Sequence, residues 1–451
     1  MQENNFELKI EKMIYGGNAM GKIDGFPYFA EGGCPDDVVD VSLIKKNKSY
    51  AIAKINSITT PSDKRVKPFC PMHSVCGSCD WQYIRYDEQL LQKQNIVKET
   101  IQKFYGEDLP VLPVKHARTD REYRHKVQYP VSQTKVSKRI IAGYFKKGTH
   151  EPVNIKFCPV QPKIFDELTE FIRETAKNLN ISGYDEKKHT GILRHIIYRM
   201  SHYNQKILVT LVLNDQKICD KIKKLADLIF EKDYIAGVCV NFNDKKTNVI
   251  TNGKSIPLKG DDFIIEKVNE ISYKVSADSF FQVNPEAAEI MFSTAKKMIE
   301  ENVKNPTILD AYSGVSAFGL QMKDIAKEIV CVEENSSSAQ DAVLNIELNQ
   351  AKNVTVINDD AAKTFAKFVS DNRKFDIVLL DPPRKGCSQD SLDFAAQLAE
   401  KIIIYVSCNP SSLARDLKYL KEKGFSAKYV RPVDMFCHTS HIENVVLIEK
   451  D

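Results

Sequence analysis

The sequence lacks any run of 18 or more apolar residues, and its first residues, MQENNFELKIEK, are polar. A helix that spans a membrane needs about 20 consecutive apolar residues, and a secretory signal needs an apolar segment close to the N-terminus. The sequence therefore predicts neither a membrane protein nor a secreted one. We expect a cytoplasmic protein that makes no membrane contact.

The chain also lacks a strong overall charge, because 64 Lys and Arg stand against 60 Asp and Glu and leave a net charge of +4. A charge this small does not by itself indicate a nucleic-acid partner. With 43% hydrophobic and 27% charged residues over 451 positions, the composition is that of a globular chain long enough for two or three domains.

The positive charge is nevertheless concentrated in one segment, residues 111–160. It contains eleven Lys and Arg against three Asp and Glu, a net charge of +8, so the rest of the chain carries −4. Cationic side chains that contact phosphates, together with rings that stack on bases, are typical of RNA-binding surfaces. The segment therefore predicts RNA contacts, and a solvated charged face is the alternative. The interleaved rings are Tyr123, His125, Tyr129, Tyr144 and Phe145.

Residues 1–58 alternate short apolar runs with Gly-rich turns, which is typical of a small antiparallel β-barrel. Residues 60–68 resemble a linker, and an apolar stripe predicts a helix over residues 87–105. Up to about residue 260 the pattern mixes strands, such as residues 206–214, with helices, such as residues 219–230. This middle part predicts an α+β domain.

From about residue 305 the pattern becomes regular, with five apolar strands separated by segments of helical length. This rhythm predicts a parallel, doubly wound sheet with helices on both faces. Because such sheets bind ligands at the carboxyl ends of their strands, the residues that end the strands are candidates for a site. The predicted strands are TILD, IVCVE, VTVI, DIVLLD and IIIYVS.

Acidic residues follow the first three of these strands. Asp310 ends the first strand and precedes a glycine turn at residues 314–319. Glu333 ends the second strand, where a carboxylate can accept hydrogen bonds from both ribose hydroxyls of an adenosine. Asp360 follows the third strand, where it can meet the adenine amino group. Together these residues predict an adenosine cofactor, either a dinucleotide or S-adenosylmethionine.

The fourth and fifth strands end in two short motifs, DPPR (381–384) and SCNP (407–410). The two prolines after Asp381 form a stiff extended turn that can frame a planar base. Cys408 lies at the end of a buried strand, just before the proline-containing turn, where its side chain is exposed to the cleft. A buried apolar cysteine is the alternative interpretation.

Four motifs, in their order and spacing, resemble those of the RNA uracil-5-methyltransferase family: FFQVN (280–284), LLDPPRKG, SCNPSSLARD and HIENVVLIE (441–449). The upstream part is similar to the ribosomal-RNA branch, which carries an N-terminal TRAM barrel and an iron–sulfur loop. The resemblance implies that Cys408 is the nucleophile and Glu443 the base in methyl transfer to C5 of a uridine. The cofactor contacts that it implies are Gln282, Tyr312, Glu333, Asp360 and Asp381.

This chemistry explains why both residue types are needed. C5 of uracil becomes nucleophilic only after a thiolate has added to C6, and the C5 proton must then be removed so that the thiolate can leave. A uridine stacked in RNA cannot reach a strand end, so base flipping is expected, with Phe280 or Phe281 as a stacking partner. Arg384 and Arg415 are candidates for stabilising the thiolate.

A second group of cysteines, Cys70, Cys76 and Cys79, lies in the loop FCPMHSVCGSCDWQY. Three cysteines this close, bounded by Pro and Gly, indicate a metal site, and Cys158 in KFCPV is the candidate fourth ligand. Four cysteines suit either zinc or a [4Fe–4S] cluster, and the resemblance favours the cluster. Disulfides are not expected in a reducing compartment. The remaining cysteines are assigned to packing: Cys34, Cys219, Cys239, Cys331, Cys387 and Cys437.

The sequence thus predicts a multidomain α/β protein. It comprises a TRAM-like or OB-like β-barrel (1–58), a central α+β RNA-binding domain with the iron–sulfur loop (59–260) and a Rossmann-like, S-adenosylmethionine-dependent methyltransferase domain (261–451). The expected substrate is 23S ribosomal RNA, without an obligate protein partner. The nearest alternative is a transfer-RNA uracil-5-methyltransferase. A non-catalytic iron–sulfur RNA-binding protein would leave DPPR, SCNP and Glu443 unused, and Pro383 disfavours a cytosine-5 methyltransferase, which places a cysteine there.

Overall fold

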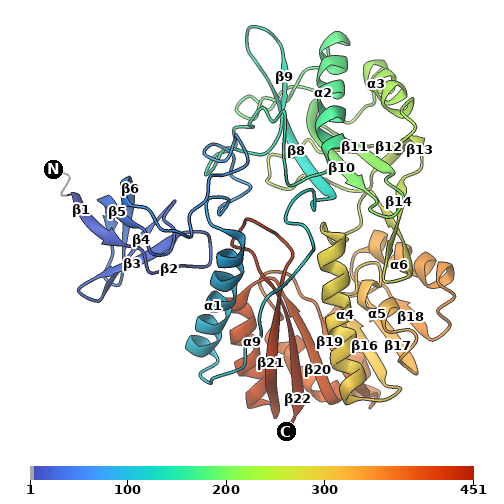
Figure 1. The fold of residues 1–451 in the computed structure, drawn as a ribbon. Coiled ribbons are helices and arrows are strands. Elements are labelled where there is room, and N and C mark those ends of the chain that lie inside the picture. Colours follow the sequence, from blue (N-terminus) through green and yellow to red (C-terminus); the bar gives the residue numbers. More distant parts are fainter. Residues whose placement is uncertain (1–4) are drawn as a thin grey trace.

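The computed structural model describes residues 5–451, so the first four residues of the polar N-terminal segment and of the predicted barrel lie outside it. The chain forms four sheets of six, six, two and eight strands (Figure 1). Of the helices in the described part, none combines the length and apolar character needed to cross a bilayer.

The N-terminal sheet has the strand order β1-β5-β6-β4-β3-β2. Its two edge strands, β1 and β2, are separated in sequence only by Ile10 and Glu11. Ile10 N donates to Asp37 O and Glu11 N donates to Met20 O, so the sheet curls until its two edges meet at these residues. The strands are β1 (Asn5–Lys9), β2 (Lys12–Met13), β3 (Ala19–Ile23), β4 (Phe26–Ala30), β5 (Val38–Lys46) and β6 (Ala51–Thr60).

The central sheet has the order β13-β12-β11-β10-β8-β9 and forms the upper lobe in Figure 1. The predicted strand at 206–214 and helix at 219–230 are confirmed as β11 and α3, and α3 connects β11 to its parallel neighbour β12. The elements are β8 (Lys126–Gln133), β9 (Ile140–Ala142), α2 (Lys163–Asn178), β10 (Leu193–Met200), β11 (Ile207–Leu213), α3 (Asp220–Phe230), β12 (Ile235–Phe242) and β13 (Ile256–Gly260), followed by the hairpin β14 (Phe263–Val268) and β15 (Ile271–Ser276).

The C-terminal sheet has the order β18-β17-β16-β19-β20-β22-β21-β7, and all five predicted parallel strands are confirmed as its first five members. Its antiparallel strand β22 lies between β20 and β21. The elements are α4 (Pro285–Asn302), β16 (Thr307–Ala311), α5 (Ala317–Gln321), β17 (Glu328–Val332), α6 (Ser336–Leu348), β18 (Val354–Ile357), α7 (Ala361–Ser370), β19 (Phe375–Leu380), α8 (Gln389–Leu398), β20 (Ala399–Ser407), α9 (Pro410–Glu422), β21 (Phe425–Asp434) and β22 (Glu443–Lys450).

Both faces of the C-terminal sheet are buried. On β19, Val378 and Leu380 belong to one hydrophobic core, whereas Ile377 and Leu379 belong to the other. This alternation follows from the two-residue period of a strand and explains why the strands are continuous apolar runs. The first core also includes Leu8 and other residues of the N-terminal sheet, so the two parts share buried apolar surface.

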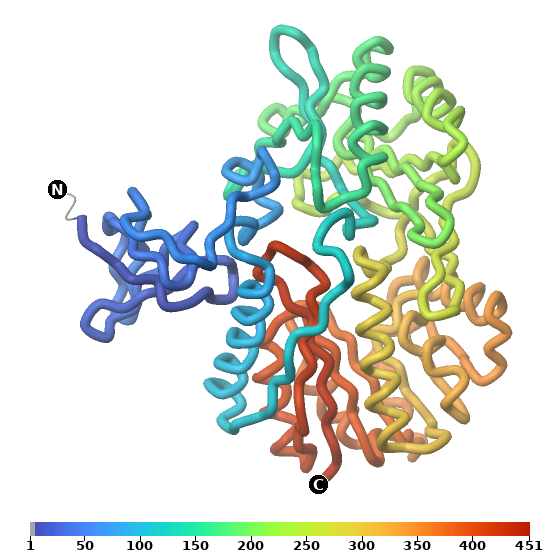
Figure 2. Tube along the Cα trace, viewed as in Figure 1, coloured from blue at the N-terminus to red at the C-terminus, as the bar shows by residue number. Residues whose placement is uncertain are grey.

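The helix predicted at 87–105 is observed as α1 (Tyr86–Phe104), but it does not pack with the central sheet. It lies against α9 and β21, and Figure 2 shows the chain from α1 onward running beside the C-terminal part. Lys93 of α1 forms a buried ion pair with Asp434 at 2.6 Å. β7 (Lys115–His116) then pairs in parallel with the end of β21. This segment, expected in the central domain of 59–260, therefore belongs with the C-terminal sheet.

Candidate active site

Strand pairing brings three of the predicted site residues to one edge of the C-terminal sheet. Asp381 follows Leu380, which pairs with Tyr405 two residues before the end of β20. Cys408 follows the last residue of β20, and Glu443 opens the antiparallel strand β22 beside it. The carboxyl ends of β19 and β20 thus meet the amino end of β22, which is the edge where a doubly wound sheet binds its ligands.

Hydrogen bonds connect the turn after β19 to the turn after β20. The Arg384 carbonyl accepts a hydrogen bond from Asn409 Nδ2 at 3.1 Å and another from Ser412 Oγ at 3.1 Å. Asn409 also caps α9, since its side chain accepts from Ser411 N at 3.0 Å, and Pro410 occupies the first turn of that helix. The DPPR and SCNP motifs therefore form one rigid unit around Cys408.

Glu443 is the most strongly perturbed group at this edge. Its side chain is buried, with 7% of its surface exposed. Burial raises the pKa of Glu443 to about 8, the charge of Asp381 raises it further and that of Arg384 opposes the shift. The carboxyl is therefore mostly protonated at neutral pH in the unliganded protein. A buried carboxyl beside a cysteine in a cleft is typical of catalytic acid–base groups.

Cys408 is half-buried at the same edge. Burial and then the charge of Glu443 raise its pKa to about 11, and Arg384 opposes them. Of the two arginines considered from the sequence, Arg384 is thus the one whose charge lowers the pKa of Cys408. Arg415 is engaged elsewhere, because its Nε donates to Asp416 Oδ1 at 2.7 Å and its guanidinium donates to Lys385 O at 2.8 Å.

Two of the carboxylates predicted to contact the adenosine already accept hydrogen bonds within the protein. Glu333 accepts from Gly314 N at 2.8 Å and from Asn335 N at 2.7 Å, so the glycine turn and the strand end are joined through its carboxylate. Asp360 is the N-cap of α7 and accepts from Lys363 N at 3.0 Å. Asp360 therefore has a structural role in addition to any contact with a ligand.

Asp310, at the end of β16, holds the glycine turn that follows it. Its Oδ2 accepts from Gly319 N at 2.8 Å, whereas Oδ1 is buried without a hydrogen-bond partner among the described residues. Burial raises the pKa of this carboxyl to about 8. A Cβ on Gly319 would lie 2.5 Å from Cys331 Sγ, so only glycine permits this close approach.

The remaining predicted cofactor contacts flank this turn. Tyr312 has a φ of +60°, which is uncommon for a residue other than glycine, and burial raises the pKa of its hydroxyl. Gln282 is half-buried in the loop before α4, and its side chain has no hydrogen bond among residues 5–451. In the same loop Phe280 is 61% exposed, whereas Phe281 is buried with its ring 5.1 Å from that of Tyr273. Only Phe280 is therefore free to stack on a base.

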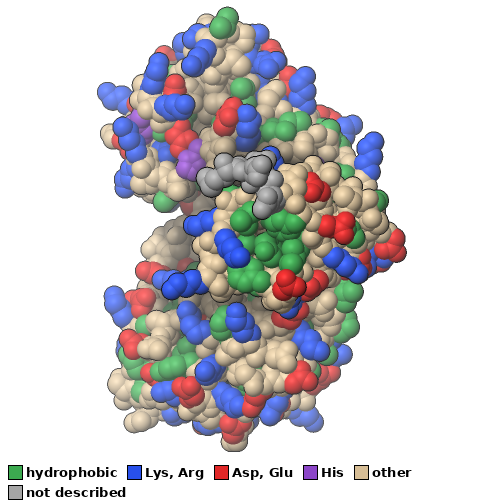
Figure 3. Space-filling model, turned by 90° about the vertical axis from the view of Figure 1, so that its left-hand side faces the viewer, with side chains coloured by type: hydrophobic (Ala, Val, Ile, Leu, Met, Phe, Trp, Pro, Cys, Tyr) green, Lys and Arg blue, Asp and Glu red, His purple; other side chains and the backbone are tan. Residues whose placement is uncertain are grey.

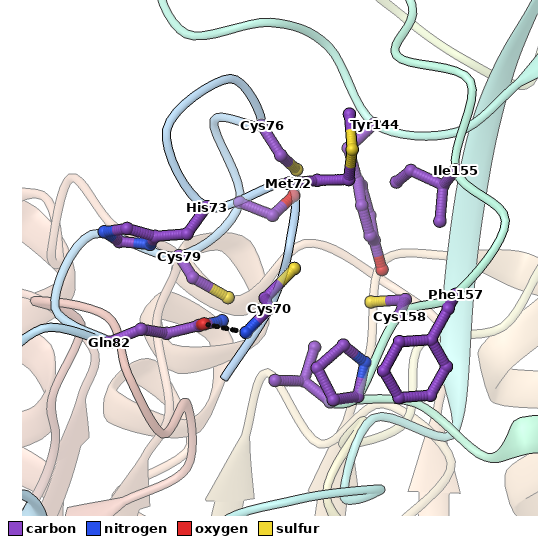
Figure 4. Close-up of a pocket in the computed structure, with 13 residues that line it drawn as sticks. Cys70, Met72, His73, Cys76, Cys79, Gln82, Tyr144, Ile155, Phe157 and Cys158 are labelled. Atoms are coloured by element: carbon purple, nitrogen blue, oxygen red, sulfur yellow. Dashed lines mark hydrogen bonds between the residues drawn. The ribbon is translucent and has the colours of Figure 1, made fainter. Parts of the chain in front are cut away.

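The four predicted metal ligands line one pocket. Cys158, far from the loop in sequence, joins Cys70, Cys76 and Cys79 there, and Figure 4 shows their thiols around a common space. In the described part of the chain, no three His, Cys, Asp or Glu side chains are grouped closely enough to hold a metal ion. The Tyr144 hydroxyl, which also lines this pocket, is buried and has no hydrogen-bond partner among residues 5–451.

The aromatic rings of the basic segment do not form the expected stacking surface. Tyr123 is 4% exposed and Tyr129 is 1% exposed, because both rings pack in the core of the central domain. On β8 the two-residue period directs Val127, Tyr129 and Val131 inward. Arg121 is exposed over the ring of Phe69. The prediction of base stacking by Tyr123 and Tyr129 is therefore wrong, whereas exposed cations remain at the surface.

Comparison with known proteins now identifies the family. The family model described as tRNA (Uracil-5-)-methyltransferase matches residues 85–451. The chain belongs to this uracil-5-methyltransferase family. An uncharacterized RNA methyltransferase of Oceanobacillus iheyensis is 34% identical over 98% of this chain and 95% of its own length. Another, of Clostridium tetani, is 34% identical over 99% and 96%.

A solved structure has the same fold. The Pyrococcus abyssi tRNA (uracil-54, C5)-methyltransferase, in complex with S-adenosyl-L-homocysteine, superimposes with a TM-score of 0.77, covering 98% of this chain and 100% of that chain at 22% identity. As a member of the uracil-5-methyltransferase family, this chain is an S-adenosylmethionine-dependent RNA methyltransferase. The family match begins at residue 85 and so includes α1 with the C-terminal sheet.

Proposed function

We propose that this uracil-5-methyltransferase methylates C5 of a uridine in 23S ribosomal RNA through a covalent bond between Cys408 and C6 of the base. The observation that supports this most directly is the register of β20 and β22, in which Ser407 pairs with Asn444. It brings a thiol and a buried carboxyl to one edge of the sheet. One group can add to C6 and the other can remove the proton from C5 of the same ring.

In the proposed reaction Cys408 loses its proton and its sulfur adds to C6, which places electron density on C5. When bound, S-adenosylmethionine would supply the methyl group: the methyl carbon would bond to C5 while its bond to the sulfonium sulfur breaks, and S-adenosylhomocysteine would leave. Glu443 then takes the proton from C5, and the electron pair of that C–H bond restores the C5–C6 double bond while the bond from C6 to sulfur breaks. The thiol proton that Cys408 loses at the start goes to solvent, and the reaction ends with the Cys408 thiolate and a proton on Glu443.

The electrostatics of the free site are compatible with this order of events. With a pKa of about 8, Glu443 is mostly neutral at neutral pH and does not oppose the first ionisation of Cys408. A sulfonium cation nearby would lower the pKa of the carboxyl below this value, which already includes the opposing charge of Arg384. Glu443 would therefore become a base when both substrates are bound.

The cofactor contacts proposed for this chain are Gln282, Tyr312, Glu333, Asp360 and Asp381. The residues present suit a cationic adenosine, because burial raises the pKa of Asp381 to about 7 and a positive ligand would favour its charged form. In this proposal Glu333 accepts from the ribose hydroxyls, as acids at the second strand end do.

We further propose that Cys70, Cys76, Cys79 and Cys158 bind a [4Fe–4S] cluster. The donor set in the pocket is made of thiols, which suit iron–sulfur clusters and zinc. Four thiolates about 2.3 Å from one zinc ion would lie close to each other, whereas a cluster of several irons needs its ligands farther apart. The role of the cluster would be to fix the loop to the central domain.

The N-terminal sheet is proposed to be a TRAM barrel at residues 1–58, followed by a central RNA-binding part and the methyltransferase part from 261 onward. The surface in Figure 3 shows a hollow between the upper and lower lobes, with Lys and Arg side chains frequent along the upper lobe beside it. It also shows an apolar patch facing the viewer. Exposed apolar side chains of the N-terminal sheet are Leu43, Ile44, Ile52 and Ile58.

A transfer-RNA substrate is the second candidate. The Pyrococcus abyssi protein is described as a tRNA methyltransferase and its fold covers 98% of this chain, the N-terminal sheet included. The presence of an N-terminal barrel therefore does not separate the two substrates.

The decisive experiment is transfer of a tritiated methyl group to unmodified 23S ribosomal RNA and to unmodified transfer-RNA transcripts, followed by mapping of 5-methyluridine. We expect label at C5 of uridine in the 23S transcript. Label in transfer RNA alone would replace the ribosomal substrate with the second candidate, and label in neither would refute both.

A further inference from the structure

The turn between β2 and β3, residues 14–18, reaches from the N-terminal sheet to the end of β20. The Tyr15 hydroxyl donates to the backbone carbonyl of Cys408 at 3.3 Å, across 393 positions of sequence. The peptide group that carries the proposed nucleophile is thus fixed by a side chain from a different sheet.

This turn is anchored on both sides of Tyr15. Met13 N, at the end of β2, donates to Gln92 Oε1 of α1 at 2.9 Å. On the other side, Trp81 Nε1 donates to Gly17 O at 3.1 Å, and the Trp81 side chain is completely buried. Since both anchors are buried hydrogen bonds, the position of Tyr15 is set by the fold.

The backbone of the turn also depends on its two glycines. Gly16 and Gly17 both have a φ of +94°, a conformation that other residues rarely adopt. A Cβ on Gly17 would lie 3.0 Å from Asp80 Cγ, in the loop that carries the proposed cluster ligands. The turn therefore fits closely between the N-terminal sheet and the rest of the chain.

Tyr15 lies in the same polar surroundings as the reacting groups. Its ring packs against the core shared with the C-terminal sheet. Burial raises the pKa of its hydroxyl, Arg384 opposes this, and the charges of Cys408 and Glu443 raise it further. The hydroxyl therefore remains a protonated donor at neutral pH, within electrostatic reach of all three groups.

We propose that Tyr15 is a positioning residue of the methyl-transfer site: its hydroxyl orients the Cys408 peptide so that the thiol faces C6 of the target pyrimidine. The N-terminal sheet then completes a site that the C-terminal sheet alone leaves open beside Cys408. This inference rests on the proposed function, because it requires Cys408 to add to the base.

The expected effect is on the covalent step and not on affinity. One hydrogen bond of this kind contributes about 0.5–1.5 kcal/mol, and small displacements of a reacting atom slow reactions strongly. We therefore expect Tyr15→Phe, which keeps the ring and removes the donor, to slow adduct formation about tenfold. The KM for RNA and the thermal unfolding temperature should stay as in the wild type.

The test uses the full-length protein and RNA transcripts in which 5-fluorouridine replaces uridine. Fluorine cannot leave as a proton, so the protein–RNA adduct persists under denaturing conditions and its rate of formation can be measured at saturating RNA. Tyr50→Phe is the matched control, because Tyr50 belongs to the same N-terminal part and its ring contacts Phe29, 5.3 Å away. A second readout is alkylation of Cys408 by iodoacetamide without RNA, followed by mass spectrometry of its peptide.

Slower adduct formation and a changed alkylation rate in Tyr15→Phe, with Tyr50→Phe unchanged, support the proposal. Equal adduct rates in wild type and Tyr15→Phe overturn it and leave the proposed function intact. Weaker RNA binding with an unchanged rate at saturating RNA also overturns it, because Tyr15 would then be an RNA contact. If the wild type itself forms no adduct with either transcript, the proposed function fails and this inference fails with it.

Discussion

Ser407 of β20 pairs with Asn444 of β22 across an antiparallel ladder, and their neighbours Cys408 and Glu443 consequently lie at the same edge of the sheet. Glu443 is buried with the strand that it opens, so its carboxyl cannot move far without breaking the ladder. Cys408 is fixed between the last residue of β20 and the N-cap of α9. The proposed nucleophile and base therefore lie at one edge of the sheet before any substrate arrives.

The first prediction concerns the covalent step. With 5-fluorouridine RNA and S-adenosylmethionine, the wild type should form a protein–RNA band that survives denaturation, because elimination cannot follow addition and methylation. Cys408→Ala should form no band and should lose methyl transfer by several orders of magnitude. Glu443→Gln should accumulate an adduct even on ordinary uridine, because an amide does not accept the C5 proton. Full turnover by Cys408→Ala would refute the mechanism.

The second prediction concerns pH. Cys408 has a pKa of about 11 and Glu443 of about 8, both raised, so both groups are protonated at low pH and must lose protons before they act. The value of kcat/KM should therefore rise steeply with pH up to about pH 8 and go on rising, less steeply, towards about pH 11. The charge of Glu443 raises the pKa of Cys408, but it is present only above the pKa of the carboxyl. Alkylation of Cys408 should thus be faster in Glu443→Gln than in the wild type at about pH 9.

The control for this comparison is Glu449→Gln. Glu449 lies on the same strand β22 and pairs with Lys428 at 3.4 Å, far along the strand from Cys408. It should leave the alkylation rate unchanged at every pH. Equal rates in all three proteins would show that Glu443 and Cys408 do not interact in solution.

Cys408 and Glu443 also show how much of the site could be predicted from the sequence. The parallel strands were predictable because they are apolar on both faces, and the residues at their ends followed from that pattern. The position of β22 between β20 and β21 was not predictable from local sequence, since strand pairing is non-local. The roles proposed for Cys408 and Glu443 follow from the family resemblance. The pairing of β20 with β22 explains why the two residues lie at the same edge.

The structure adds a capping role to one predicted contact, because Asp360 is the N-cap of α7. One expectation failed for a local physical reason. Tyr129 points into a core because it occupies an inward position of β8. The contact of Tyr15 with Cys408 could not be predicted from the sequence, because the two residues are 393 positions apart. Only the packing of the N-terminal sheet brings them together.

The third prediction concerns the cysteine pocket. Protein purified without oxygen should be brown, with broad visible absorption and about four irons per chain, because four cysteines would bind one cluster. Cys158→Ser should lose the colour and reduce the unfolding temperature, since Cys158 links the loop to the central domain. Cys239→Ser, at a buried cysteine outside the pocket, is the control and should keep the iron. A colourless anaerobic protein with one zinc would establish the alternative metal.

The fourth prediction concerns RNA affinity. Arg124 and Lys126 of the basic segment are half-buried, so charge reversal there would disturb folding as well as binding. Arg118 and Arg121 are exposed, and Arg118 lies beside Glu286 at the start of α4. If both contact phosphates, reversing them to Glu should weaken RNA binding and reduce the slope of log affinity against log salt by at least about 1.4.

The control is reversal of Lys163 and Lys223, two exposed lysines on the helices α2 and α3 that cover the central sheet. This variant has the same change in net charge, so a general electrostatic effect would weaken RNA binding equally in both proteins. A loss of RNA affinity confined to the variant at Arg118 and Arg121 would place the RNA beside α4. This position is next to the loop that carries Phe280 and Gln282. An unchanged dissociation constant in both variants would show that this part of the basic segment is a solvated face, and the phosphate contacts would then have to be sought on the N-terminal sheet.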